Sequence, residues 1–160
     1  MINESLWFLD TLVQVRASFN DGSNRISVLE HHAPPGDSPP LHLHRNEDEI
    51  FYVLAGEFRF QLGEKQRRLG VGACVVAQQG VPHTYRVESP TGRFLTVTGG
   101  EDFERFVRAV GRPADQMVLP PPAGPTTVEM MARLAKIAAS HGIEFCGPPL
   151  QDDPTRTSST

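Results

Sequence analysis

The chain has few of the features that direct a protein out of the cytoplasm or into a membrane. It contains two cysteines, which cannot form the disulfide framework of a small secreted domain. No segment approaches the length of about 18 apolar residues that a membrane span needs. Residues 1–5 lack the basic region that precedes the apolar stretch of a signal peptide. We therefore expect a cytoplasmic protein with no membrane partner.

Positive charge is also scarce, since the formal net charge is −4 and the isoelectric point is about 5.8. Proteins that bind nucleic acids neutralise phosphates with clustered lysine and arginine side chains. The short basic cluster at residues 65–68 has the composition of a solvated hairpin tip and does not amount to such a surface. We expect no nucleic-acid partner.

The two cysteines are not expected to carry chemistry. Cys74 lies in the apolar segment 73–77, where a thiol usually packs as a small hydrophobic side chain. We therefore predict that Cys74 belongs to the core.

Residues 6–98 have the pattern of an antiparallel β-protein. Eight or more short segments read as strands, and glycine- or proline-bearing turns connect them without an intervening helix. Phe58, Phe60 and Leu62 alternate with polar residues, so they are expected to share one buried face. With 160 residues, 39% of them hydrophobic, the chain can bury one ordinary core. The sequence predicts an all-β protein with a single barrel or jelly roll over about 6–98, within one domain spanning 1–150.

After residue 98 the hydrophobic period changes from that of a strand to that of a helix. Phe103, Phe106, Val107 and Val110 recur at helical spacing, and Gly111 is a suitable end. A short helix is therefore expected to cap the sheet.

A helical C-terminal extension is predicted over about 101–145. A proline-rich strap, Pro113 to Pro125, leads to a capping box at Thr126–Glu129 that opens a helix to about Ser140. The helix has one apolar stripe, so we expect it to pack on the outside of the barrel. Residues 151–160 contain no apolar side chain, and we expect a disordered tail there.

The densest chemistry lies in the segment GDSPPLHLHRNEDEIFYVLAG, residues 36–56. His42 and His44 are two apart, so in a strand both imidazoles point to the same side of the sheet. Residues 45–48 read as a turn, and Glu49 begins what looks like the returning strand. Its carboxylate could approach the two imidazoles. Two nitrogens and an oxygen in an apolar setting suit a divalent transition ion with open positions.

A fourth candidate ligand, His83, follows a tight turn in Gly80-Val81-Pro82 and begins another apolar strand. Phe51 and Val53 share the phase of Glu49, and Tyr85 shares that of His83. These three side chains are therefore expected to line a substrate pocket on the metal side of the sheet.

The spacing Gly36-x5-His42-x-His44-x4-Glu49-x6-Gly56 resembles the first motif of the cupins, with every signature position filled. A second cupin motif is similar but incomplete. Gly72, Gly80 and His83 stand at its glycine and histidine positions, whereas Gln78 and Val87 replace the usual proline and asparagine. The resemblance spans roughly residues 24–98. It implies a cupin jelly roll with one divalent ion held by the two motifs.

Cupin barrels host many reactions, so the fold does not settle the activity. The segment from Phe103 to Pro149 resembles small bacterial cupins related to quercetinase, the dioxygenase that cleaves flavonols. This likeness implies a metal-dependent dioxygenase that uses O2 on a flavonol-like or other enolisable aromatic substrate. In flavonol cleavage a glutamate is proposed to take the substrate's hydroxyl proton, and that catalytic role falls on Glu49. The alternatives are a non-oxidative isomerase, cyclase or decarboxylase, and a non-catalytic small-molecule-binding cupin.

The identity of the metal and the oligomeric state stay open at this level. Three imidazoles and a carboxylate accept iron, manganese, nickel, cobalt, copper or zinc. Many cupins dimerise through N-terminal strands, so the resemblance implies a homodimer that uses residues 1–19.

Overall fold

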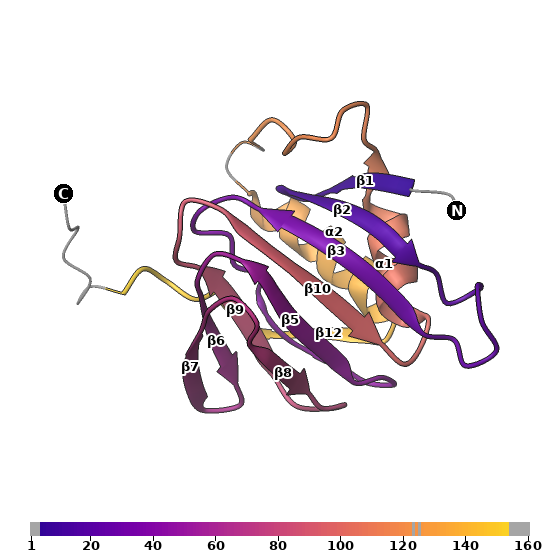
Figure 1. The fold of residues 1–160 in the computed structure, drawn as a ribbon, viewed down its shortest axis with the longest axis horizontal. Helices are drawn as coiled ribbons and strands as arrows, with labels where there is room; N and C mark the ends of the chain where they lie inside the picture. The colour runs from indigo at the N-terminus through magenta and orange to yellow at the C-terminus, as the bar shows by residue number, and fades with distance from the viewer. Residues whose placement is uncertain (1–3, 123, 125, 154–160) are drawn as a thin grey trace.

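The structure is a computed structural model that describes residues 4–122, 124 and 126–153. These residues fold into two antiparallel sheets and two helices (Figure 1). The larger sheet has the order β11 (Arg112–Pro113), β1 (Glu4–Phe8), β2 (Thr11–Ala17), β3 (Ser27–Ala33), β10 (Gly92–Thr98), β5 (Glu49–Ala55), β8 (Cys74–Ala77). The smaller sheet has the order β12 (Ile143–Gly147), β4 (Leu41–His44), β9 (His83–Val87), β6 (Phe58–Leu62), β7 (Lys65–Leu69). The helices are α1 (Asp102–Val110) and α2 (Val128–Ser140). The all-β jelly-roll class expected from the sequence is confirmed.

Different partners cover the two halves of the larger sheet. At one end, aromatic side chains of β5 and β10 pack against β6 and β9, and the rings of Phe51 and Phe60 are 4.6 Å apart. At the other end, side chains of β1–β3 pack against both helices, and Phe8 meets Phe106 edge-on at 5.5 Å. Helices therefore take the place of strands over half of the barrel, behind the sheet in Figure 1.

The turn at residues 45–48 does not close a hairpin, contrary to the expectation of a returning strand. It connects β4 of the smaller sheet to β5 of the larger one, so His44 and Glu49 approach each other from facing sheets. The sequence pattern of a turn between two strands is the same whether the strands pair with each other or belong to different sheets. Which strand each one pairs with depends on contacts with distant strands.

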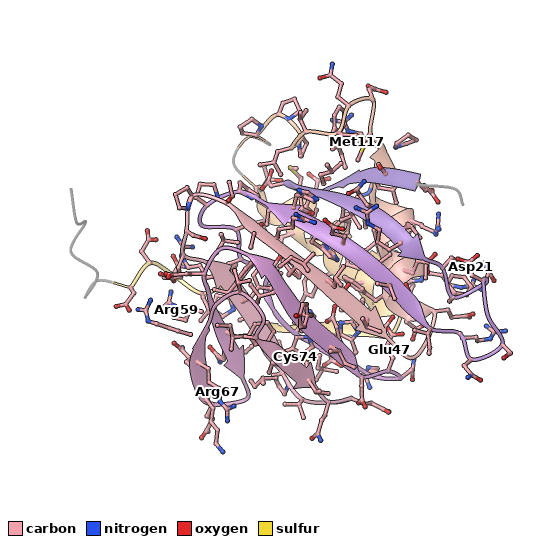
Figure 2. The ribbon with its side chains drawn as sticks, in the orientation of Figure 1. Asp21, Glu47, Arg59, Arg67, Cys74 and Met117 are labelled. Atoms are coloured by element: carbon pink, nitrogen blue, oxygen red, sulfur yellow. The ribbon has the colours of Figure 1, made fainter. Side chains whose placement is uncertain are left out.

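Cys74 is exposed, which corrects the prediction that it belongs to the core (Figure 2). It lies on the edge strand β8, where Ala77 is buried and Val76 is half exposed. Every side chain of Cys74–Ala77 is apolar, so the sequence carries no alternation from which the inward face could be read.

Helix α2 begins at Val128 and ends at Ser140, as predicted to within two residues. The Thr127 hydroxyl caps it by accepting a hydrogen bond from the Met130 amide at 3.1 Å. The helix packs against the strands of the larger sheet, but it is not only an outer cover, because its Met130, Leu134 and Ile137 line the same cavity as His42 and Glu49. An apolar stripe specifies that a helix face is covered but not what covers it. Neither helix among the described residues has the length and hydropathy needed to cross a membrane.

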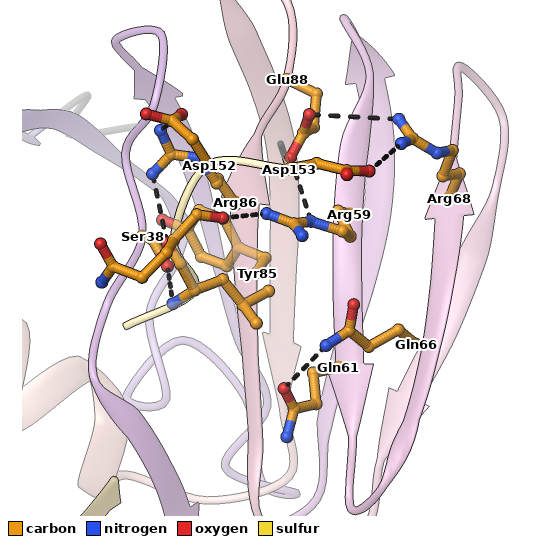
Figure 3. Close-up of polar contacts among 12 residues, drawn as sticks. Ser38, Arg59, Gln61, Gln66, Arg68, Tyr85, Arg86, Glu88, Asp152 and Asp153 are labelled. Carbon is orange, nitrogen blue, oxygen red and sulfur yellow. Dashed lines mark hydrogen bonds and ion pairs between the residues drawn. The ribbon is translucent and has the colours of Figure 1, made fainter. Parts of the chain in front are cut away.

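The end of the described chain lies against the smaller sheet (Figure 3). Asp152 pairs with Arg86 of β9, and Asp153 pairs with Arg68 of β7 at 2.8 Å. Residues 154–160 of the expected disordered tail lie outside the described residues.

Glu104 is the fully buried acidic residue of α1 and joins this helix to the loop after β2. Its carboxylate accepts hydrogen bonds from the Ser18 hydroxyl at 2.8 Å, the Phe19 amide at 3.0 Å and the Arg108 guanidinium at 2.8 Å. Burial opposes ionisation, but the donors from Phe19, Ser18 and Arg108 outweigh it and hold the pKa of Glu104 below its ordinary value.

We predict that Glu104→Ala lowers the free energy of unfolding by about 1–3 kcal/mol, since it leaves the buried Phe19 amide, and the partly buried Ser18 and Arg108 donors, without this acceptor. Because the folded pKa is depressed, the contribution of Glu104 is complete above its unfolded value of 4.5 and disappears as the pH falls through the folded value. Urea unfolding at pH 7 and at lower pH measures both effects. Glu64→Ala, at an exposed turn, is the control; equal stability of the two variants would contradict the assignment.

Candidate metal centre

The four ligands predicted from sequence converge at the junction of the two sheets. His42 of β4 stands opposite His83 of β9 in register, and their rings are 4.5 Å apart. His44 lies two residues further along β4, with its ring 5.3 Å from that of His83. Glu49 reaches the imidazoles from β5 of the facing sheet. One nitrogen or oxygen atom from each of the four residues lies within 4.8 Å of the others, and all four side chains are buried. This group could hold a metal ion.

Backbone carbonyls orient two of the imidazoles. The Nδ1 atom of His42 lies 2.7 Å from the Pro40 carbonyl oxygen, and that of His83 lies 3.0 Å from the Val81 carbonyl oxygen. A carbonyl oxygen accepts only, so in both rings Nδ1 carries the proton and donates. The lone pair of each neutral ring is then on Nε2, as a metal ligand requires.

A buried carboxylate, Glu47, does the same for His44. Its Oε1 atom lies 3.3 Å from His44 Nδ1 and accepts the Phe103 backbone amide at the start of α1, at 2.7 Å. Glu47 was expected to be a solvated residue of a polar turn, but the residue is only 4% exposed. Figure 2 labels it in the turn before β5. Its separation of three residues from a predicted ligand was the one available signal.

The inward-facing atoms of the cluster bring several electron-pair donors close together, an arrangement that a bound cation would stabilise. Nε2 of His83 lies 3.1 Å from Glu49 Oε2, and Nε2 of His44 lies 3.3 Å from the same oxygen. When the His44 and His83 rings are neutral with the proton on Nδ1, their Nε2 atoms and the carboxylate are all acceptors. His44 Nε2 is buried without a hydrogen-bond partner among the described residues. A divalent transition ion accepts electron pairs from such a three-nitrogen, one-oxygen set, so the residues fit one.

Electrostatics favour the protonation state that metal binding requires at His42 and Glu49, whereas at His44 a proton competes with a metal ion. Burial lowers the pKa of His42 to about 3, reinforced by the neighbouring His83 and His44, so this ring is neutral. Burial opposes ionisation of Glu49, but positive charge on His44 and a proton shared with His83 outweigh it and hold the pKa of Glu49 down at about 2 when no metal is bound. Burial also disfavours the charged form of His44, yet Glu49 and Glu47 outweigh it and raise the pKa of His44. The site therefore attracts positive charge, from a proton or an ion.

The cluster borders a cavity of about 510 Å³, a size typical of small-molecule sites. His42 and Glu49 form part of its wall, and aromatic rings form much of the rest: Phe8, Phe51, Tyr85, Phe94, Phe103, Phe106 and Phe145. Of the predicted pocket residues, Phe51 and Tyr85 line this cavity. Val53 lies instead in the packed core between the sheets. The residues that α1 and α2 contribute to the cavity, and Asp37, were not predicted from the sequence.

We predict that Glu47→Gln lowers metal affinity by about 10- to 100-fold, since an amide is a weaker acceptor for the His44 ring than a carboxylate. Elemental analysis after dialysis against graded chelator measures the loss. His44→Ala sets the lower limit by removing the ligand itself, and Glu57→Gln, an exposed glutamate, is the matched control. Full occupancy of the Glu47 variant at every chelator concentration would contradict the orienting role.

Comparisons with known proteins agree with this geometry. Residues 29–98, which contain all four clustered side chains, match the sequence model of the cupin domain. The chain is 30% identical to quercetin 2,3-dioxygenase of Bacillus subtilis over 110 residues. This match covers 69% of the chain but 32% of the relative, so the chain spans about a third of that protein's length.

Two solved structures are similar in both sequence and fold. The polyketide cyclase RemF of Streptomyces resistomycificus is 28% identical, with a TM-score of 0.51 over 59% of this chain and 68% of that one. A predicted oxalate decarboxylase of Thermotoga maritima is 27% identical, with a TM-score of 0.52 over 55% and 78% of the two chains. Together with the two-sheet architecture and the filled first motif, these matches establish that the chain is a member of the cupin superfamily.

Proposed function

We propose that the chain is a metal-dependent dioxygenase of the quercetinase type, which cleaves a flavonol-like or other enolisable aromatic compound with O2. The observation that carries this proposal is the opening of the buried cluster, through His42 and Glu49, into a large cavity walled by aromatic rings. Planar aromatic compounds pack well between such walls. The similarity to a quercetin 2,3-dioxygenase supports the same class of substrate.

The residues that would hold the metal are His42, His44, Glu49 and His83. A divalent transition ion bound there, one of iron, manganese, nickel, cobalt, copper or zinc, would supply Lewis acidity and an open position for a substrate oxygen. The apolar rings around it would hold the substrate flat and exclude water from the reacting atoms.

Glu49 is the proposed base for the substrate's hydroxyl proton. Its pKa of about 2 reflects positive charge on its neighbours acting against burial, which by itself raises the pKa of this carboxylate. When a substrate oxygen brings negative charge to the same place, the effect of the neighbours weakens and the effect of burial remains. Glu49 then becomes basic enough to accept a proton while it moves away from the histidines.

The test is oxygen uptake by protein purified without a histidine tag, loaded with each candidate metal and supplied with a panel of flavonols. We expect uptake to depend on both metal and flavonol, and His42→Ala protein serves as the metal-deficient control. Product formation without oxygen uptake would replace the dioxygenase by a non-oxidative cupin, an assignment that the similarity to a polyketide cyclase favours as second candidate. Reversible binding without product would indicate a non-catalytic module.

A second prediction separates the two roles of Glu49. Glu49→Gln keeps the shape and one acceptor oxygen but removes the basicity, so the variant should retain much of its metal while losing most of its turnover. Metal content and steady-state rate are measured on the same preparation. Turnover at the wild-type rate with full metal would exclude Glu49 as the base.

Two further expectations from the sequence stay predictions: a cytoplasmic location, and a homodimer that uses residues 1–19. Within the described part of that region, β1 is already paired on both sides, with β2 and with β11. A dimer through this region would therefore not pair strands along the edge of β1 at Leu6 and Trp7, where β11 already lies.

A further inference from the structure

Asp37 and Tyr85 form a second polar pair in the wall of the cavity, separate from the four clustered residues. Asp37 lies in the loop between β3 and β4, and Tyr85 lies on β9. The Tyr85 hydroxyl donates to Asp37 Oδ2 at 2.8 Å. The proposed reaction assigns no role to either polar group, and most of the surrounding wall is aromatic or aliphatic.

The Phe51 ring lies next to both the pair and the candidate metal centre. Tyr85 follows His83 by two residues on one strand, so both side chains point to the same face, roughly 6–7 Å apart along the strand. The ring of Phe51 is 5.9 Å from that of His83 and 6.3 Å from that of Tyr85. A planar ligand lying along Phe51 can therefore reach both places at once.

The pair offers acceptors to a ligand. Because the Tyr85 proton is donated to Asp37, the tyrosine oxygen retains lone pairs that can accept. Among the described residues, Tyr85 is the one side chain found to donate to the Asp37 carboxyl. Burial raises the pKa of Asp37 to about 6 against the hydrogen bond from Tyr85, and Asp10 adds to the increase. Asp37 is partly exposed on the cavity wall, and a hydroxyl donor on a ligand would give its carboxylate a second hydrogen bond.

The loop that carries Asp37 is held firmly before any ligand arrives. Its backbone pairs with Val87 on both sides, through the Gly36 amide at 2.9 Å and the Asp37 carbonyl at 3.0 Å. The Thr84 hydroxyl donates to the Pro39 carbonyl at 2.7 Å.

The C-terminal segment holds the same loop from outside (Figure 3). The Leu150 amide donates to the Ser38 hydroxyl at 3.0 Å, and Arg86 donates to the carbonyl oxygens of Gly36 and Leu150. Asp152 pairs with the same guanidinium. The Asp37 carboxyl is therefore preorganised, which lowers the entropic cost of using it to bind a ligand.

We propose that Asp37 and Tyr85 form a hydroxyl anchor, which accepts a hydrogen bond from a ring hydroxyl of the substrate while another substrate oxygen binds at the metal centre. This inference rests on the proposed function, because it takes the ligand to be a planar aromatic compound. It narrows the substrate class to compounds with a second hydroxyl, on a ring apart from the enolisable group.

The experiment compares the binding of two flavonols without oxygen. Quercetin carries further ring hydroxyls, whereas 3-hydroxyflavone carries only the one on the enolisable ring. Dissociation constants are measured by anaerobic absorbance titration of metal-loaded protein. We expect wild type to bind quercetin about tenfold or more tightly than 3-hydroxyflavone, as for a hydrogen bond to a charged acceptor.

In Asp37→Asn an amide donor can replace the free acceptor, so the preference for quercetin should disappear while 3-hydroxyflavone binding stays within about twofold of wild type. Tyr85→Phe removes one acceptor and should reduce the preference in part. If Asp37→Asn fails to fold, the preference of Tyr85→Phe for quercetin tests the anchor by itself, and an unchanged preference would contradict it. Asp115→Asn, an exposed position outside the cavity, is the matched control and should keep the full preference.

Equal binding of the two flavonols by wild type, or an unchanged preference in both cavity variants, would overturn the anchor and leave the dioxygenase proposal standing. If the preference for quercetin depends on Asp37 but no oxygen is consumed, the anchor is supported and the dioxygenase proposal is wrong. Failure of metal-loaded wild type to bind either compound would overturn both.

Discussion

A buried carboxylate facing three imidazoles is the interaction on which the rest of this structure depends. Removing Glu49 from water is costly unless positive charge lies beside it, and the histidines supply such charge only when a proton or a cation is present. The two sheets bring these groups together from opposite sides, so the barrel and the site stabilise each other. Carbonyl oxygens of Pro40 and Val81 then fix which nitrogen of each ring faces inward.

Helix α1 links this centre to the rest of the fold through two buried glutamates. Glu47 accepts the Phe103 amide in the first turn of the helix and also holds the His44 ring. Within the helix, Glu104 binds the loop after β2. The turn at residues 45–48 is held in addition by Asn46, which donates to Asp102 at 2.7 Å, and by the Arg45 amide, which donates to Gly142 at 2.8 Å. The orientation of one candidate ligand thus depends on helix packing well outside the barrel strands.

The cavity exists because the two halves of the larger sheet are covered differently. Where β6 and β9 cover it, aromatic side chains interdigitate and fill the space. Where the helices cover it, side chains of α2 such as Met130 and Leu134 reach the cavity and remain partly exposed. On the proposed function, the helical side and the Asp37 loop would select the substrate, and the strands would supply the candidate metal ligands.

Local sequence determined most of the strands and the candidate ligand set, because strand alternation and the spacing of His42, His44 and Glu49 are properties of a few consecutive residues. The class of fold and four converging side chains were predictable for that reason. Local sequence did not reveal β7, which covers the expected hairpin tip at residues 65–68, or β12, which lies in the expected helical extension. The tertiary structure alone decided that residues 45–48 cross between sheets, that Cys74 faces outward, and that α2 borders the cavity. It also turned Glu47 inward and placed Asp37 against Tyr85, 48 positions away. Each of these depends on which distant surface covers a segment, and a pattern of apolar and polar residues records that a face is buried without recording its partner.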